Sequence, residues 1–217
     1  MKTDPERFIR DNTALCAPPH VPEIGLHLAD EAHELWLKTE DELEAIGLPP
    51  PFWAFAWAGG QGLARHVLDN PELVAGKKVL DFASGSGLVA IAALLSGACS
   101  VLAADLDPWA ATAARLNASA NDVELDFTRS DLVGTDASWD VVLAGDVFYD
   151  RTMTDRILPW FETLARRGAL LLIGDPGRAY CPRGRMELLA TYQVAVTRAL
   201  EDSETKRTSV FRLLPER

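Results

Sequence analysis

A pair of glycines and two acidic residues are spaced as in sites that bind adenosine. The stretch from Asp81 to Gly87 reads Asp-Phe-Ala-Ser-Gly-Ser-Gly and ends an apolar run. Gly85 and Gly87 let the backbone turn tightly against a ligand, and a helix that begins there offers unpaired N–H groups. Asp105 ends the next apolar run, where its carboxylate would accept hydrogen bonds from two ribose hydroxyls. These residues predict a site for a cofactor that contains a nucleoside.

Two cofactor classes share these features. Gly85-x-Gly87-x-x-Ala90 also satisfies the loose dinucleotide fingerprint. However, a loop that binds a pyrophosphate normally begins directly after its strand, whereas here Asp81 and three more residues precede Gly85. The carboxylate of Asp81 would also repel the phosphates. That carboxylate suits a ligand with a cationic centre and an amino-acid end, which describes S-adenosylmethionine. We therefore expect S-adenosylmethionine, released as S-adenosylhomocysteine; a nicotinamide oxidoreductase and an adenosine-binding module without chemistry remain the alternatives.

Residues after the second and third expected strands complete the predicted cofactor site. Leu106 follows Asp105 directly, and Asp131-Leu132 follows the third strand. Asp131 would accept from the adenine amino group while Leu132 covers the ring, although an exposed loop acid is the alternative. Asp107 precedes a proline at a helix start and is expected to cap that helix.

An aromatic segment, Phe-Trp-Ala-Phe-Ala-Trp over residues 52–57, precedes the regular part of the chain. Trp57 leads into a helix start beside the cofactor. We expect its ring to face the sulfonium, because an aromatic face attracts a cation and excludes water. Phe52 and Phe55 are expected to attach the N-terminal residues to the core.

The fourth expected strand ends in Gly-Asp-Val-Phe-Tyr-Asp over residues 145–150, and Asp146 and Tyr149 should face the transferable methyl group. An acid with an aromatic wall would attract and orient an amine. The prolines typical of sites for planar amide-like nitrogens are absent from this motif, which favours an sp³ amine such as lysine. The alternatives are an Asp146 that merely caps a turn and a tyrosine packed in the core.

The fifth expected strand ends in Gly-Asp-Pro-Gly-Arg over residues 174–178. Asp175 is a candidate second acidic contact for the substrate. Arg178 would pair with Asp175 or with a carboxylate on the partner. A plain turn explains the segment equally well.

The elements that must position these residues alternate from Gly59 onward. Short, nearly apolar strands alternate with helices, as expected when helices cover both faces of a parallel sheet. We expect strands at 77–82, 100–105, 123–128, 139–145 and 169–174, and helices at 60–69, 87–97, 108–120 and 153–166. Residues 191–201 and 206–213 alternate between apolar and polar, which predicts a hairpin. The expected fold is α/β: a Rossmann-like, doubly wound, mostly parallel seven-stranded sheet with a C-terminal antiparallel hairpin.

Residues 1–58 are expected to form a short extension packed on a catalytic domain of residues 59–217. Within the extension we expect a helix over 4–15 and strands over 23–29 and 33–38. A further short helix is expected from the Thr39 capping box to Gly47.

Composition excludes several classes of function. The formal net charge is −11, and acidic side chains predominate in residues 1–150. This balance disfavours nucleic acid and suits a cationic partner such as a protein lysine. The three cysteines have no ligand-like spacing, so neither a disulfide framework nor a metal site is expected. A charged start and a broken apolar run over 82–104 predict neither a secretory signal nor a membrane span. We expect a cytoplasmic monomer.

With these residues considered together, the sequence resembles the class I, seven-strand lysine methyltransferases of the family-16 type, in particular those that act on the electron transfer flavoprotein β-subunit. The resembling stretches cover nearly the whole chain: Thr13, 21–24, 52–61, 81–87, 105–108, 145–150 and 174–178. Ala58 stands where members often have proline. The resemblance implies a protein lysine methyltransferase whose substrate is the flavoprotein β-subunit, with another protein such as a ribosomal one as the alternative.

Overall fold

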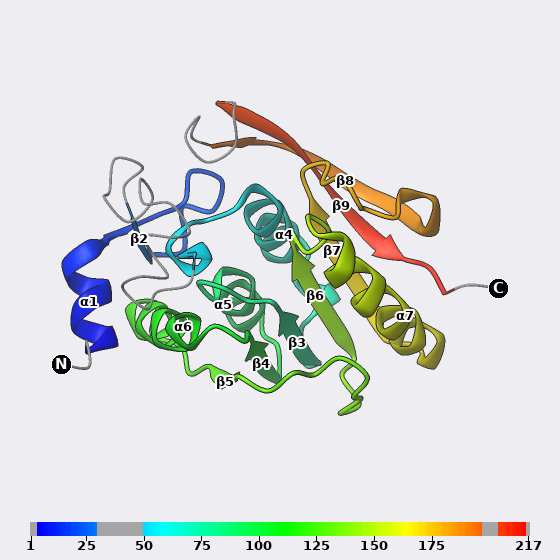
Figure 1. Ribbon diagram of the computed structural model, residues 1–217, viewed down its shortest axis with the longest axis horizontal. Coiled ribbons are helices and arrows are strands. Elements are labelled where there is room, and N and C mark those ends of the chain that lie inside the picture. The colour runs from blue at the N-terminus through cyan, green and yellow to red at the C-terminus, as the bar shows by residue number, and fades with distance from the viewer. Residues whose placement is uncertain (1–3, 30–49, 197–203, 216–217) are drawn as a thin grey trace.

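The computed structural model describes residues 4–29, 50–196 and 204–215. The expected strand over 33–38 and the expected helix that ends at Gly47 lie outside these residues. Within them, a seven-stranded sheet has the order β5-β4-β3-β6-β7-β9-β8 (Figure 1). Its strands are β3 (Lys78–Phe82), β4 (Ser100–Ala104), β5 (Asp126–Thr128), β6 (Val141–Gly145), β7 (Leu170–Asp175), β8 (Met186–Ala195) and β9 (Thr205–Leu213).

The strand directions confirm the expected fold class. Strands β3 to β7 pair in parallel, whereas β9 runs antiparallel to both β7 and β8. The order reverses at β3, whose neighbours are β4 and β6. In open α/β sheets, the crevice for a ligand lies at the carboxyl ends of the strands at such a reversal.

Alternate residues of each central strand supply two separate cores. In β6, Val141 and Leu143 join the core beneath α4 (Ala58–Asp69) and α5 (Leu88–Leu95). Val142 and Ala144 join the opposite core, beneath α7 (Arg151–Arg167). Because helices cover both faces, the strands read as continuous apolar runs. Figure 1 shows α7 across the sheet from α5, and α6 (Pro108–Ala120) beside α5.

The N-terminal residues pack on the core through short elements. Helix α1 (Pro5–Asn12) ends earlier than expected, because residues 14–16 form the strand β1 (Ala14–Cys16), which pairs antiparallel with β2 (Leu26–Leu28). The Thr13 hydroxyl donates to the Ile9 carbonyl and so completes the last turn of the helix. The expected helix over 4–15 is therefore wrong in its last residues.

The C-terminal hairpin is present, but β8 begins earlier than the expected 191. A register shift between Leu188 and Ala190 places an extra residue in the strand. Such a bulge interrupts the alternation of apolar and polar residues, so the sequence pattern does not reveal the first half of β8.

Candidate active site

A cavity of about 870 Å³ opens at the carboxyl ends of β3, β4 and β6. Its wall brings together the sites expected from the sequence: the loop after β3, Asp105, Asp131-Leu132, Asp146, Tyr149, Trp57 and Arg178. Asp175 is absent from the wall. The cavity therefore extends from the carboxyl ends of β3 and β4, which we call the cofactor end after the sequence expectation, to the carboxyl end of β6, which we call the acceptor end.

The loop after β3 takes backbone conformations that explain its composition. Gly85 and Gly87 have φ of 49° and 80°, and even Ala83 has φ of 55°. A side chain at position 85 would meet nothing closer than the Trp53 Cα at 3.9 Å, so conformation rather than crowding calls for glycine there. At Gly87, the N-cap of α5, an added Cβ would also lie 3.1 Å from the Ala114 Cβ.

Asp105 holds this loop in place. Its Oδ2 accepts from the Gly85 N–H at 2.9 Å, and its Oδ1 accepts from the Asp107 N–H at 3.0 Å. Each oxygen keeps further acceptor capacity for a ligand hydroxyl. Asp107 caps α6 by accepting from the Trp109 N–H at 2.8 Å, which confirms its expected role.

Asp81 lies deeper than its motif suggested, because its side chain is 1% exposed. Its Oδ2 accepts from the Ala90 N–H of α5 at 2.9 Å. Burial, together with the nearby negative charge of Asp105, raises the pKa of Asp81 to about 8. The carboxyl is thus mostly neutral at pH 7, in contrast to the ionised group that the sequence argument assumed.

The remaining expected cofactor residues line the mouth of the cavity. Leu106 is 60% exposed and Leu132 is half-buried. The exposed Asp131 accepts from the Val133 N–H and pairs with Arg156 at 2.6 Å. Arg156 also lines the cavity and was missed, because nothing in the sequence brings this helix residue next to Asp131.

The aromatic segment contributes differently from what its sequence predicted. Phe55 is buried with Ile9 and the inner face of α6, as expected. Phe52 does not join that core: it is 46% exposed and lines the cavity. Its ring lies 5.9 Å from that of Trp57 and 6.2 Å from that of Tyr149. The prediction that Phe52 attaches the N-terminal residues to the core is therefore wrong.

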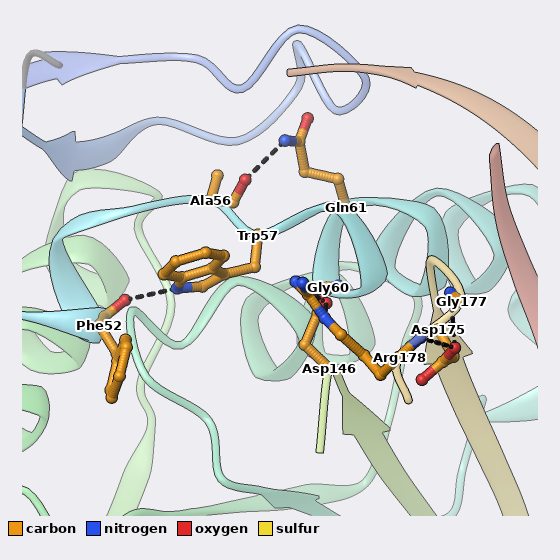
Figure 2. Close-up of polar contacts among 9 residues, drawn as sticks. All are labelled: Phe52, Ala56, Trp57, Gly60, Gln61, Asp146, Asp175, Gly177 and Arg178. Atoms are coloured by element: carbon orange, nitrogen blue, oxygen red, sulfur yellow. Dashed lines mark hydrogen bonds and ion pairs between the residues drawn. The ribbon is translucent and has the colours of Figure 1, made fainter. Parts of the chain in front are cut away.

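Trp57 is held in place through both its indole ring and its backbone. Its indole N–H donates to the Phe52 carbonyl at 2.9 Å, and Trp57 is the N-cap residue of α4 (Figure 2). The buried Gln61 ties this turn to the rest of the chain. Its amide donates to the Ala56 carbonyl at 2.7 Å and accepts from the His20 N–H.

Asp146 occupies a strained position at the end of β6. Its φ is 57°, in the left-handed region, and its N–H donates to the Gly174 carbonyl at 2.9 Å. Its Oδ2 accepts from the Gly60 N–H at 3.1 Å. Such conformations persist only where the surrounding structure enforces them, and they cluster at functional sites. Asp146 is thus held by the start of α4 and the end of β7.

Three glycines allow these elements to approach so closely. A Cβ at Gly59 would lie 2.4 Å from the Gly174 carbonyl oxygen, and one at Gly174 would lie 2.1 Å from the Gly59 carbonyl oxygen. A Cβ at Gly145 would lie 2.9 Å from the Gly60 backbone. The Gly59-Gly60 pair was visible in the sequence, but its role in this contact could not be inferred without the topology.

The Gly-Asp-Pro-Gly-Arg segment forms a turn that presents one side chain to the cavity. Asp175 is 2% exposed, and its Oδ1 accepts from the backbone N–H groups of Gly177 and Arg178. The Arg178 guanidinium pairs instead with Asp146 and lies over the Trp57 ring (Figure 2). The sequence did not anticipate the pairing between Arg178 and Asp146.

Tyr149 is not packed in the core. Its side chain is 52% exposed and lines the cavity. Desolvation and the nearby Asp150 and Asp105 raise its pKa, so the phenol stays neutral. It forms an aromatic wall together with Phe52.

Two features are absent from the part of the chain that the structure describes. Among residues 4–29, 50–196 and 204–215, no cluster of three His, Cys, Asp or Glu side chains is arranged to hold a metal ion. Within the same ranges, no helix is both long and apolar enough to cross a membrane.

Solved structures share this architecture. A ribosomal protein L11 methylase from Lactobacillus delbrueckii subsp. bulgaricus has a TM-score of 0.53 and 19% identity over 73% of this chain and 81% of that one. Magnesium protoporphyrin IX methyltransferase from Synechocystis PCC 6803, solved with bound SAM, has a TM-score of 0.54 and 15% identity over 71% and 77% of the two chains. These likenesses confirm the Rossmann-like fold.

Sequence comparisons divide along the cavity. The family model of ribosomal protein L11 methyltransferase (PrmA) matches residues 65–147, which span the cofactor end and stop beside Asp146. By contrast, electron transfer flavoprotein beta subunit lysine methyltransferases match most of the chain. The protein from Danio rerio is 43% identical over 81% of this chain and 69% of its own length, and that from Homo sapiens is 40% identical over 81% and 68%.

An alignment over 81% of the chain includes both Asp146 and Tyr149 wherever it begins. The protein from Caenorhabditis elegans, a homolog of the same methyltransferase, is 33% identical over 86% of this chain and 82% of its own length. This breadth confirms the expected resemblance and excludes the nicotinamide oxidoreductase. The chain belongs to the family of the electron transfer flavoprotein beta subunit lysine methyltransferases.

Proposed function

We propose that this protein transfers methyl groups from S-adenosylmethionine to lysine side chains of the electron transfer flavoprotein β-subunit. The observation that carries the proposal is the match to those enzymes across both ends of the cavity. When bound, the cofactor supplies a methyl group whose bond to sulfur breaks as the lysine nitrogen attacks, which leaves S-adenosylhomocysteine.

The cofactor end fits an adenosine with an amino-acid tail. Asp105 would accept from the ribose hydroxyls, with Gly85 and Gly87 keeping the loop close to the ligand. Leu106 and Leu132 would cover the adenine ring. Asp131 would accept from the adenine amino group, and this requires it to share its carboxylate with Arg156.

Asp81 would act at the amino-acid tail. Its pKa of about 8 would fall when a cationic ligand binds nearby, because an opposite charge favours the ionised carboxylate. Trp57, fixed by its N–H, would face the sulfonium side of the cavity and exclude water.

At the other end, Asp146 and Tyr149 would receive the lysine. Asp146 would attract the ammonium and orient it until it has lost its proton to solvent, because only the neutral amine has the lone pair that forms the new C–N bond. The rings of Tyr149 and Phe52 would form an apolar wall around the lysine stem. Holding nucleophile and methyl group in line supplies much of the rate enhancement. Asp175 would act indirectly, by fixing the backbone of Arg178.

A ribosomal protein is the second candidate substrate. A ribosomal protein L11 methyltransferase from Pseudomonas aeruginosa is 56% identical over 29% of this chain. However, the family model stops at residue 147 and leaves out Tyr149 and Arg178. The flavoprotein subunit is therefore preferred.

We also propose that the protein acts in the cytoplasm as a monomer, with residues 1–58 as an extension that supports the catalytic domain. Trp53 of this extension stacks 6.4 Å from Trp109 of α6, and Cys16, Cys99 and Cys181 are free thiols, which suits a reducing compartment. Light scattering of the purified protein tests the monomer.

Methyl transfer to two purified proteins tests the proposed substrate. Each protein, the flavoprotein β-subunit or ribosomal protein L11 from the same organism, is incubated with enzyme and methyl-labelled S-adenosylmethionine, and mass spectrometry locates the label. We expect label on lysines of the flavoprotein subunit. Label on L11 alone would overturn the substrate, and label on neither would overturn the proposed function.

A further inference from the structure

A cation of the protein itself occupies the acceptor end of the cavity. The Arg178 Nε and Nη2 donate to the Asp146 Oδ1 at 2.8 and 2.5 Å. The guanidinium carbon lies 5.8 Å from the centroid of the Trp57 ring (Figure 2). Both side chains of the ion pair are largely buried, with 22% of Arg178 and 12% of Asp146 exposed.

The groups that hold this guanidinium are the groups that would recognise an alkylammonium. A carboxylate supplies the opposite charge, and an aromatic face attracts any cation placed over it. A lysine that enters the cavity to reach Asp146 therefore meets a place already taken. Simultaneous occupation would put two cations beside one carboxylate.

We propose that Arg178 is an internal stand-in for the substrate lysine. Its guanidinium leaves Asp146 when a lysine enters and returns when the product departs. The inference rests on the proposed function. The exchange replaces one cation by another on the same carboxylate, so the net charge of the acceptor end does not change.

The turn that carries Arg178 lets the side chain move while its backbone stays. The Asp175 carboxylate holds the N–H groups of Gly177 and Arg178 at 2.7 and 2.9 Å. Gly177 has φ of 105°, which favours glycine and sharpens the turn. Exchange can therefore proceed through a new rotamer of one long, partly exposed side chain, without movement of the turn.

This arrangement selects for lysines delivered by a docked protein. A free amine must displace Arg178 by its own affinity for Asp146 and Trp57. A lysine on a docked protein competes at a much higher effective concentration, because the rest of the surface already holds it there. Arg178 would thus protect the methyl donor from small amines and from lysines in unrelated peptides.

The test compares the parent with Arg178→Ala, Arg178→Met and Arg178→Lys. The probe is Nα-acetyl-lysine amide, whose side-chain amine is free, and it is offered with S-adenosylmethionine. We expect kcat/KM for the probe to rise at least about threefold in the Ala and Met variants, and to rise less in Arg178→Lys, which still supplies a cation. A fall in the Ala and Met variants would overturn the proposal, because it would mean that the ion pair is needed during turnover.

Guanidinium ion then separates a stand-in from a group that positions Asp146. Guanidinium chloride at up to about 50 mM, with sodium chloride as the equal-salt control, should slow methylation of the probe by Arg178→Ala at least about threefold. It should leave the rate of the parent unchanged. Rescue of the variant, or no effect, would overturn the proposal. Arg183→Ala, in the same loop but outside the cavity wall, is the matched control and should behave like the parent.

A binding measurement keeps this test independent of turnover. Butylammonium should raise the melting temperature of Arg178→Ala and of Arg178→Met by more than it raises the melting temperature of the parent. If the parent methylates no protein, the proposed function fails, while this measurement still tests the stand-in. If the flavoprotein subunit is methylated but butylammonium does not distinguish the variants from the parent, the stand-in alone fails.

Discussion

The two ends of the cavity hold their acidic side chains by different means. At the cofactor end, Asp105 and Asp81 accept from the backbone N–H groups of Gly85 and Ala90, which the fold keeps in place. At the acceptor end, Asp146 accepts from the Gly60 backbone N–H and from the guanidinium of Arg178, a long side chain. Backbone donors cannot leave, whereas Arg178 can. We therefore infer a preformed site at the proposed cofactor end and an exchangeable one at the proposed acceptor end.

The close approach of α4 to β7 underlies the acceptor end, and breaking it should have the largest effect. In Gly174→Ala the new Cβ would lie 2.1 Å from the Gly59 carbonyl oxygen, which is backbone and cannot turn aside. We expect the free energy of unfolding to fall by about 3 kcal/mol or more. Urea unfolding measures it. Gly184→Ala, where a Cβ meets nothing within 4 Å, is the control, and equal stability of the two variants would contradict the packing argument.

The cofactor end is tested next by Asp105→Ala. The variant loses the carboxylate proposed for the ribose and leaves the Gly85 N–H without this acceptor. The affinity for S-adenosylhomocysteine, measured by calorimetry, should fall by about 1.5–3 kcal/mol. Asp126→Ala, an exposed acid at the start of β5, should bind as the parent does. Parental affinity in Asp105→Ala would place the cofactor elsewhere.

Asp81→Asn tests whether the cofactor end contains a buried neutral carboxyl. The folded-state pKa of about 8 lies above the ordinary value of 3.8, so folding binds a proton between these two pH values. Stability from this group is complete below about pH 4 and is lost as pH rises to about 8. Without cofactor, the free energy of unfolding of the variant minus that of the parent should therefore increase by roughly 2 kcal/mol from pH 6 to pH 8. A constant difference across this range would mean that Asp81 is already ionised.

Much of this contrast could be predicted from the sequence, but not the partners of the side chains. The glycine motif, Asp105 and the strand ends follow from local spacing, because the carboxyl ends of neighbouring parallel strands meet at one edge. Arg178 and Asp146 lie 32 residues apart, so their pairing depends on β7 lying beside β6. The burial of Asp81 depends likewise on the position of α5, and the exposure of Phe52 depends on its place in the cavity wall. Alternation also failed at the bulge in β8.

The acceptor end is tested by Asp146→Asn. Asparagine tolerates the left-handed backbone conformation of this position, so the change removes the charge and keeps the turn. Methyl transfer should fall at least about tenfold, or ~1.4 kcal/mol of barrier, with little change in cofactor affinity. The effect should persist at saturating protein substrate. Melting temperature and single-turnover rate are measured on one preparation, and full activity per folded molecule would eliminate the catalytic role of Asp146.

The smallest effect is expected for Tyr149→Phe, which separates the ring of the acceptor wall from its hydroxyl. The ring lies 6.2 Å from that of Phe52, and desolvation followed by the charges of Asp150 and Asp105 raises the pKa of the phenol. A phenol with a raised pKa is not the base that takes the proton of the lysine, so we expect the ring rather than the hydroxyl to matter for transfer. We expect kcat/KM to stay within about threefold of the parent in Tyr149→Phe, or ~0.7 kcal/mol, and to fall at least about tenfold in Tyr149→Ala. If the phenylalanine variant is as impaired as the alanine variant, the hydroxyl holds the amine, and the acceptor end depends on a second polar contact besides Asp146.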